Sequence, residues 1–266
     1  MPELPDVETF RRYLDANGLD QTIEDVAVYD ERVVKRATPA ELADYLRGHC
    51  LVRTYRRGKH LFAALEEAGW LELHFGMTGY LAYYRDPGDA PDYSHVRFAY
   101  ANGYHLAFVD RRKLGYVAPV RDLQACVAEL DLGIDALDPD LDGPAFRELA
   151  EGRRGQVKCW LMDQATIAGI GNVYSDEILF HAGIHPRTPL PNLDGADLDR
   201  LHGRMRNVLK TAIDAQVQPQ AMPADFLVPL REVDGAACPR CGTPLAKVKA
   251  CGRTAQYCPS CQPSPD

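Results

Sequence analysis

Four cysteines near the carboxyl end have the spacing of a metal site. They form two CxxC pairs, Cys238/Cys241 and Cys258/Cys261, with sixteen residues between the pairs. This spacing is typical of a zinc ribbon, in which four thiolates surround one Zn²⁺ and leave no position for water or substrate. We therefore expect one structural Zn²⁺ that folds a short hairpin. Two disulfides, or two redox-active CxxC motifs, are the alternative.

The hairpin between the two cysteine pairs is basic. It contains Lys247, Lys249 and Arg253, and it has no carboxylate. A rigid basic hairpin can contact phosphates, although zinc ribbons also serve as plain scaffolds. Cys251 lies in the hairpin but outside the ligand pattern. The remaining cysteines are interpreted as small core residues: Cys50, Cys126 and Cys159.

The amino end offers a second kind of chemistry. Pro2 is small enough for Met1 to be removed, which would expose a secondary amine. An α-amino group has a pKa near ~8, so more of it is a free nucleophile at neutral pH than of a lysine amine. Glu3 follows directly and can act as an acid or a base. The simpler alternative is that Pro2 and Pro5 stiffen the entry to a helix.

Basic residues are clustered in a chain whose net charge is −8. An acidic segment, 122–151, lies between basic stretches, and this arrangement favours a face presented to a polyanion. Solvated surface is the alternative for any single run. The clusters are Arg53, Arg56, Arg57 and Lys59; Arg111, Arg112 and Lys113; and Arg153, Arg154 and Lys158.

Several elements must position these residues. Apolar residues at helical spacing predict helices over 6–14 and 198–212, and a capping box at Thr38 predicts a third. Period-two alternation predicts strands over 70–75, 95–100 and 104–109, the last two joined at Asn102–Gly103 by a type I′ turn. Strands in the first half followed by helices and a cysteine unit predict an α+β, multidomain chain.

Composition sets the class of protein. Of 266 residues, 46% are apolar and 26% charged, which predicts a folded globular protein. No run approaches the ~20 apolar residues that a membrane helix needs, and the amino end is acidic where a secretory signal would be basic. We expect a cytoplasmic protein with no membrane partner.

A series of motifs in one order resembles the formamidopyrimidine-DNA glycosylase and endonuclease VIII family, and the Pro-Glu-Leu-Pro start is nearer the formamidopyrimidine branch. The motifs extend over nearly the whole chain. They are Pro2–Glu8, Lys59, His74–Gly79, Asp110–Gly115, Lys158–Asp163, Gly169–Glu177, Ala182–Pro186 and the terminal cysteine pairs.

The resemblance implies three domains and a monomer. Residues 1–121 would form an amino-terminal helix and an antiparallel β-sandwich. Residues 122–233 would form a helical domain with a helix-two-turns-helix motif, and residues 234–266 a Cys₄ zinc-finger hairpin. The implied location is the cytoplasm, with the nucleoid if the source is prokaryotic.

The resemblance also implies a base-excision repair enzyme acting on duplex DNA that contains a damaged base or an abasic site. The damaged nucleotide is flipped out of the stack, because its sugar cannot be reached inside the duplex. The Pro2 amine then attacks the sugar carbon C1′, expels the base and forms a Schiff base. Elimination cuts the strand, so the enzyme is both glycosylase and lyase.

Catalytic roles carry over by position. Pro2 would be the nucleophile, and Glu3 would protonate the sugar ring oxygen and shuttle protons. Glu177 would help to orient Pro2. Lys59 and Arg253 would hold phosphates around the reacting nucleotide.

DNA-binding roles carry over in the same way. Asn172 would hold a phosphate beside Arg253, and Lys158 would add to that grip. Three residues would fill the gap left in the duplex: Met77, Arg112 and Leu114. Taken singly, each of these residues has a simpler interpretation as a core residue, a helix cap or a surface charge.

The sequence departs from the family pattern at three places. Asp6 replaces the usual Glu, and Leu114 replaces the usual Phe. Only ten residues, 228–237, separate the Asp225–Leu227 segment from Cys238. In this region the formamidopyrimidine branch has a longer loop that closes over oxidised guanine. Ring-opened purines, oxidised pyrimidines and abasic sites are therefore open alternatives to 8-oxoguanine.

Two other classes of protein remain as alternatives. A protein that binds damaged or bent DNA without cleaving it would fit if Met1 were retained, because an acylated Pro2 nitrogen cannot attack. A zinc-ribbon RNA-binding protein would bind single strands and would not depend on Pro2.

Overall fold

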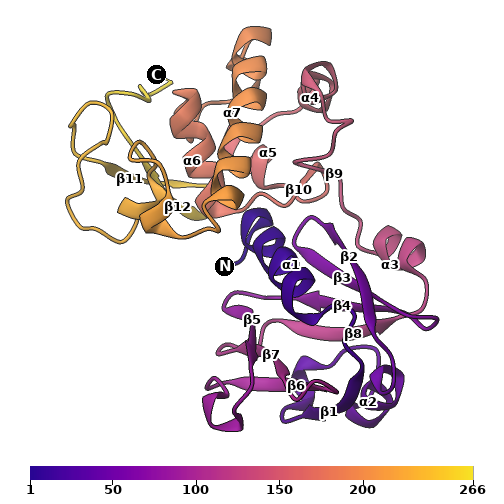
Figure 1. The fold of residues 1–266 in the computed structure, drawn as a ribbon. Helices are drawn as coiled ribbons and strands as arrows, with labels where there is room; N and C mark the ends of the chain where they lie inside the picture. The colour runs from indigo at the N-terminus through magenta and orange to yellow at the C-terminus, as the bar shows by residue number, and fades with distance from the viewer. Residues whose placement is uncertain (266) are drawn as a thin grey trace. The chain divides into compact units, whose positions relative to one another are not determined.

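The computed structural model describes residues 1–265, and the chain forms two compact units that meet in sequence between Asp131 and Leu132 (Figure 1). The boundary lies ten residues after the one drawn from the sequence. Helix α3 (Leu123–Glu129) belongs to the first unit because its Cys126 packs in one cluster with Phe62 and Val120.

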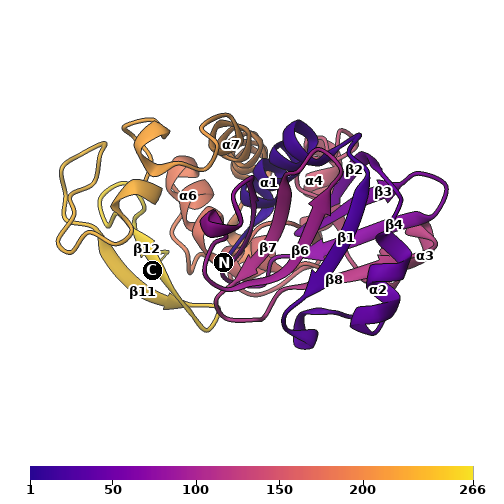
Figure 2. The same ribbon diagram turned by 60° about the horizontal axis from the view of Figure 1, so that its bottom comes forward.

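The first unit is built on two four-stranded antiparallel sheets, as the alternation of the strands predicts. Figures 1 and 2 show these strands in indigo to magenta. One sheet has the order β1-β6-β7-β5 (Ile23–Val28, Ser94–Tyr100, His105–Asp110, Gly79–Tyr84) and the other β2-β3-β4-β8 (Leu51–Arg57, His60–Leu65, Gly69–His74, Tyr116–Val120).

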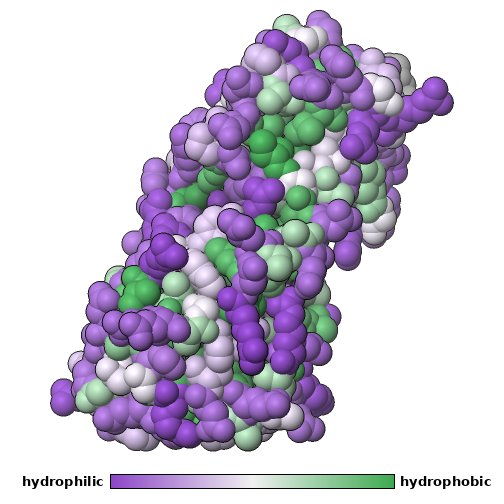
Figure 3. Space-filling view, turned by 90° about the vertical axis from the view of Figure 1, so that its right-hand side faces the viewer, coloured by the Kyte–Doolittle hydropathy of each residue, from purple (hydrophilic) through white to green (hydrophobic). Residues whose placement is uncertain are grey.

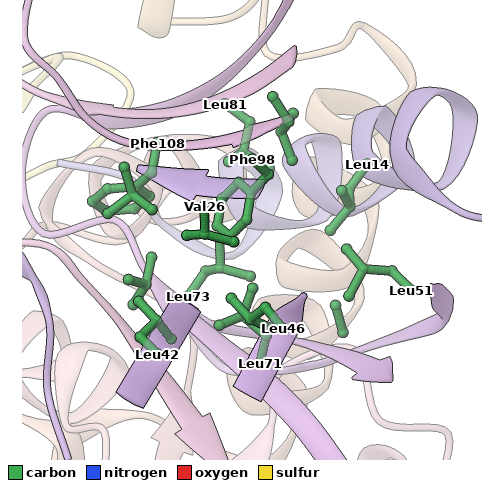
Figure 4. Packing of buried hydrophobic residues seen from close by; sticks show 14 of the residues in the cluster. Leu14, Val26, Leu42, Leu46, Leu51, Leu71, Leu73, Leu81, Phe98 and Phe108 are labelled. Carbon is green, nitrogen blue, oxygen red and sulfur yellow. The ribbon is translucent and has the colours of Figure 1, made fainter. Parts of the chain in front are cut away.

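The core of this unit lies between the two sheets. Phe98 and Phe108 from the first sheet and Leu71 and Leu73 from the second belong to one buried cluster (Figure 4). Leu14 of the amino-terminal helix joins the same cluster. Burial of each such side chain contributes about 1.5–3 kcal/mol, so the shared core stabilises the first helix against the sandwich.

The predicted helices of the first unit are confirmed. Helix α1 spans Leu4–Gly18, and helix α2 spans Pro39–Leu46. In α2, the Thr38 hydroxyl accepts from the Glu41 amide, and the Glu41 carboxylate accepts from the Thr38 amide at 2.8 Å. This reciprocal pair is the predicted capping box.

The turn between β6 and β7 is of a different type from the one predicted. Gly103 has a φ of 80°, whereas Asn102 is not among the residues with positive φ. The Gly103 amide donates to the Tyr100 carbonyl at 2.9 Å. The connection is therefore a three-residue loop with a single left-handed glycine, and a type I′ turn would need two left-handed residues.

The second unit combines helices with the cysteine hairpin. Phe180 of α6 and Leu227 share a buried cluster with Cys238 and Cys258, so the hairpin and the helices have a common core. The elements are β9 (Ile134–Asp135), α4 (Gly143–Ala150), α5 (Val157–Met162), β10 (Ile167–Ala168), α6 (Asn172–Ala182), α7 (Gly195–Asp214), β11 (Ala246–Ala250) and β12 (Arg253–Tyr257).

Hydrophilic residues cover most of the face drawn in Figure 3, and apolar residues occupy smaller areas between them. Within residues 1–265, no helix combines the length and the apolar character needed to cross a membrane.

Candidate functional site

The predicted nucleophile lies at the entry to α1. Pro2 is half-buried, and Met1 before it is 52% exposed. Glu3 is the N-cap of the helix and is almost fully buried, and its amide donates to Asp6 Oδ2 at 2.9 Å. The capping box formed by Glu3 and Asp6 fixes the direction in which the chain enters the helix.

The shorter carboxylate at position 6 has an altered acidity. Burial raises the pKa of Asp6 from 3.8 to about 6, the hydrogen bond from Glu3 lowers it, and the negative charge of Glu3 raises it again. The charge of one carboxyl group at the start of the helix therefore affects the pKa of the other, Asp6.

Lys59 is brought to the same place by a tight turn. Gly58 and Lys59 connect β2 to β3, and Gly58 has a φ of 56°. Burial lowers the pKa of Lys59, while the charges of Glu3 and Asp6 oppose that shift. The predicted cation thus lies within electrostatic reach of the predicted acid.

A buried carboxylate stands behind the Lys59 turn. Glu72 of β4 accepts from His60 Nδ1 at 2.8 Å, from the Tyr116 hydroxyl at 2.8 Å and from Arg36 at 2.7 Å. Burial raises the pKa of Glu72, but these partners outweigh it and the net shift is downward. Because His60 directly follows Lys59, the network fixes the start of β3 and with it the end of the turn that contains the lysine.

The three residues predicted to fill the duplex gap lie on two loops of the first unit that touch. A Cβ added to Gly76 would meet the Gly115 amide nitrogen at 2.4 Å, so the loops before β5 and before β8 approach backbone to backbone. Met77 is 37% exposed and Leu114 is 51% exposed. Exposed apolar side chains on rigid neighbouring loops suit a wedge.

Asp110 holds the second of these loops. Its Oδ2 accepts from the amides of Leu114 and Gly115 at 2.8 and 2.7 Å, and its Oδ1 accepts from the Arg112 amide and the Thr78 hydroxyl. Burial raises the pKa of Asp110, but these hydrogen bonds lower the pKa by more, so its net shift is downward and the carboxylate stays ionised. Arg112 is exposed at the tip.

In the second unit, Asn172 and Arg253 line one pocket of about 220 Å³. Asn172 Nδ2 donates to the Thr254 carbonyl at 3.2 Å. Its Oδ1 is buried and, among the described residues, has no hydrogen-bond partner. Lys247 and Arg231 add positive charge to the pocket, and Glu232 is its one carboxylate, so it suits an anion such as a phosphate.

Lys158 occupies a different kind of position. It is fully buried, and its Nζ pairs with the Asp176 carboxylate and donates to the Asn172 carbonyl at 3.2 Å. Asp176 also accepts from Arg231 at 2.8 Å and from the Gln256 amide at 3.1 Å. Lys158 thus supports the backbone of Asn172, and its predicted direct contact with DNA stays a prediction.

Glu177 is buried and holds the segment before the hairpin. Its two oxygens accept from the amides of Leu227 and Val228 at 3.0 and 2.8 Å. His181 Nε2 lies 3.0 Å from Glu177 Oε1. Because Arg240 can only donate to His181 Nδ1, the neutral ring carries its proton on Nε2, facing Glu177. The predicted role of Glu177 toward Pro2 stays a prediction.

The four predicted zinc ligands come together. The sulfurs of Cys238, Cys241, Cys258 and Cys261 all lie within 4.8 Å of one another. The Cys241–Cys258, Cys241–Cys261 and Cys238–Cys261 sulfurs are 3.5, 3.6 and 3.8 Å apart. Zn–S bonds of about 2.3 Å in a tetrahedron require sulfurs about 3.8 Å apart, so the cluster fits one Zn²⁺. The ion would supply folding energy, since all four positions around it are protein ligands.

The expectation for Cys159 is corrected. It forms a disulfide with Cys251, the hairpin cysteine that lies outside the zinc pattern. The sequence interpretation missed this pair because the two positions are 92 residues apart and only the fold brings them together. Cys126 is buried as expected, and Cys50 is half-buried.

Three carboxylates without a predicted role hold their neighbours in place: Glu72 and Asp110 in the first unit and Asp176 in the second. Glu72 occupies a polar position in an alternating strand, where a solvent-facing side chain is expected, but Arg36, Tyr116 and Cys126 cover it. Asp176 lies directly before Glu177 in a motif singled out in the sequence. The only signal for these residues is an acidic side chain inside a motif, for Asp110 and Asp176, or close to one, for Glu72.

Family models match most of the chain. Residues 1–117 match the formamidopyrimidine-DNA glycosylase N-terminal domain, and residues 132–221 match the H2TH domain of the same enzymes. Residues 235–263 match a zinc finger found in FPG and IleRS.

Relatives and solved structures agree with these matches. The formamidopyrimidine-DNA glycosylase of Moorella thermoacetica is 37% identical, over 94% of this chain and 95% of the relative. That of Geobacter metallireducens is 36% identical, over 98% and 100%. The Lactococcus lactis Fpg in complex with DNA containing an abasic site has a TM-score of 0.88 at 28% identity, covering 98% of this chain and 100% of that one. The chain belongs to the formamidopyrimidine-DNA glycosylase family.

Proposed function

We propose that Pro2 is the nucleophile and Glu3 the acid and base of this DNA glycosylase and AP lyase. The observation that carries the proposal is the placement of Glu3, Asp6 and Lys59 around the entry to α1, directly beside Pro2. The active form requires Pro2 to be the first residue, so that its nitrogen is a free amine.

The chemistry divides between these residues. The Pro2 nitrogen attacks C1′ of the damaged nucleotide and displaces the base, and the proton lost from the nitrogen leaves with the base. Glu3 then delivers a proton to the ring oxygen, the bond from C1′ to that oxygen breaks, and the opened sugar is left as an iminium on Pro2. Loss of a proton from C2′ then expels the 3′ phosphate and cuts the strand. Lys59 binds a phosphate beside the reacting sugar, and its positive charge stabilises the departing oxygen.

The substrate is duplex DNA with a damaged base or an abasic site. Asn172 and Arg253 would bind backbone phosphates in their shared pocket, and Met77, Arg112 and Leu114 would fill the space that the flipped nucleotide leaves. We expect a monomer that acts in the cytoplasm, with the nucleoid in a prokaryote. Solved structures of the Lactococcus lactis enzyme contain abasic-site DNA and Fapy-dG DNA, which supports both substrate classes.

The lesion preference should follow from the short segment before Cys238. Val228–Leu230 is a 3-10 helix whose start is bound by Glu177, and Arg231 behind it is bound by Asp176. A segment anchored at both points leaves little chain to close over a base. We therefore expect ring-opened purines, oxidised pyrimidines and abasic sites to be better substrates than 8-oxoguanine.

Borohydride trapping tests the nucleophile. The protein is made with a removable extension before Pro2, so that the Pro2 nitrogen is an amide until a protease exposes it. We expect no covalent band on abasic duplex before cleavage, a strong band afterwards, and a DNA-linked peptide that begins at Pro2. The Glu3→Gln variant should lose base excision by about 10²–10⁴-fold.

The extended and cleaved proteins form a matched pair because they share the same folded body. A band of equal strength before cleavage would assign the Schiff base to another amine. Tight duplex binding without any band after cleavage would instead support a non-cleaving damage-binding protein.

A further inference from the structure

We infer that Cys159 and Cys251 form a redox-controlled tether that positions Arg253, and the turn directly before it, for DNA binding. The inference rests on the proposed binding of phosphate by Arg253. It concerns how firmly that residue is held, which the zinc site alone does not decide.

Cys251 lies in the tight turn between β11 and β12. β11 and β12 pair with Ala250 opposite Arg253, so Cys251 and Gly252 form a two-residue turn. Both have positive φ, 55° and 66°. Such turns favour Asn-Gly, and a left-handed cysteine costs backbone energy. A cysteine in this place is therefore unfavourable for the turn itself and gains its value from the bond it makes.

The disulfide partner of Cys251 comes from a helix that is distant in the sequence. Cys159 lies on α5, and the two Cα atoms are 5.2 Å apart, within the range that a disulfide spans. The bond is accessible to small thiols because Cys251 is exposed and Cys159 is half-buried. The zinc ligands are separate from this pair, since their four sulfurs form their own cluster.

The two cysteines lie beside residues that line or support the proposed phosphate pocket. Arg253 directly follows the turn, two residues after Cys251, and is exposed. Lys158, next to Cys159, supports the Asn172 carbonyl and the Asp176 carboxylate. The disulfide therefore ties the turn beside Arg253 to the helix whose lysine supports Asn172, and these two residues line one pocket.

Other bonds hold the hairpin, but they act away from the turn residues. Arg187 donates to the Lys249 carbonyl at 2.7 Å, Asn172 donates to the Thr254 carbonyl, and the Gln256 amide donates to Asp176. A reduced hairpin should therefore stay folded, while its turn and the Arg253 side chain sample more conformations. Ordering them on binding then costs affinity.

The chemistry is a thiol–disulfide exchange with a low-molecular-weight disulfide. One cysteine thiolate attacks that disulfide, forms a mixed disulfide and releases one small thiol. The second cysteine then displaces the other small thiol. Two protein thiols lose two electrons and two protons, and one small disulfide gains them and becomes two thiols. A phosphine reductant reverses the change.

The test compares oxidised and reduced protein on duplex DNA containing a tetrahydrofuran abasic analogue. We expect reduction to weaken binding by about threefold to tenfold. Borohydride trapping on saturating abasic DNA should change by less than about twofold, because Pro2 and Glu3 belong to the other unit. Peptides containing Cys159 and Cys251 should be linked before reduction, and zinc content should stay constant.

Variants separate the tether from other effects of reduction. Cys251→Asn keeps a residue that suits the left-handed turn but removes the bond, and Cys159→Ser removes the bond from the other side. Both should bind DNA like reduced wild type under all conditions. Cys50→Ser, in the other unit, should keep the full redox response.

The outcomes are distinct. Equal DNA affinity of the oxidised protein, the reduced protein and Cys251→Asn would overturn the tether while leaving the enzyme assignment intact. Absence of the linked peptide after treatment with oxidised glutathione would overturn it as well. Failure to bind or trap abasic DNA in either state would instead contradict the proposed function on which the tether rests.

Discussion

At the scale of single residues, the amino end holds several charged side chains close together and away from solvent. Glu3 is almost fully buried, and the burial of Asp6 raises its pKa to about 6. Lys59 is close enough for its ammonium to offset part of this negative charge. A carboxyl group with a raised pKa is a common feature of catalytic sites, because it allows proton transfer near neutral pH.

The raised pKa of Asp6 predicts how stability depends on pH. The folded protein holds the Asp6 proton more tightly than the unfolded chain, whose ordinary value is 3.8. The contribution of this group is therefore complete below about pH 3.8 and is lost as the pH rises through about 6. Asp6→Asn keeps an acceptor for the Glu3 amide and has no charge to desolvate.

Urea unfolding of the two proteins measures this effect. Between pH 5 and pH 8, we expect the stability of wild type to fall by about 1.5 kcal/mol relative to Asp6→Asn. Asp89→Asn, at an exposed aspartate, should leave the difference from wild type constant over the same range. A constant difference for Asp6→Asn would show that Asp6 titrates at its ordinary pKa.

At the scale of elements, two loops of the first unit act as one structure. Gly76 and Gly115 allow the backbones to touch, and the Asp110 carboxylate binds amides of its own loop and the Thr78 hydroxyl of the other. Met77 and Leu114 are thereby exposed without being mobile tips. A wedge must be rigid in this way, since it has to resist the stacked bases on either side.

Replacing Asp110 by Asn tests this interpretation. The NH₂ group of the asparagine would face either the Leu114 and Gly115 amides or the Thr78 hydroxyl and the Arg112 amide. In both orientations a donor would face other donors. We expect a loss of stability of about 3 kcal/mol and weaker binding to abasic duplex. Thr78→Ala removes one partner and should cost about 1 kcal/mol.

Chemical denaturation and DNA binding of the two variants check the prediction together. Equal losses for Asp110→Asn and Thr78→Ala would mean that the Leu114 and Gly115 amides find water instead. Unchanged affinity of a folded Asp110→Asn protein would remove the wedge role from this loop.

At the scale of the whole molecule, the two units have different sources of stability. The first has a large apolar core between two sheets. The hairpin of the second has a small cluster around Phe180 and Leu227, which includes two of the zinc ligands. Zinc bound by four cysteines contributes on the order of 10 kcal/mol in isolated fingers, so the hairpin depends on the ion.

Removal of zinc should therefore affect the units unequally. After treatment with a strong chelator, we expect proteolysis to begin between residues 232 and 265 and binding to abasic duplex to be lost. The melting transition of residues 1–131 should remain. Added Zn²⁺ should restore binding, and a chelated protein with an intact hairpin would show that the apolar cluster suffices.

The sequence by itself determined the elements and the ligands. Apolar spacing is local, so the patterns around Val7, Thr38 and Leu198 predicted helices that the structure contains, and CxxC spacing identified a metal cluster. The order of motifs also indicated the family. These features are determined by near neighbours in the chain or by fixed spacing.

Only the tertiary structure decided the contacts between distant residues. It paired Cys159 with Cys251, covered Glu72, placed Asp110 against the amides of Leu114 and Gly115, and buried Lys158 against Asp176. The turn at Asn102–Gly103 belongs to this group as well, because strand register set its length. Burial and partners depend on which surfaces meet in the fold, and chain spacing carries no record of that meeting.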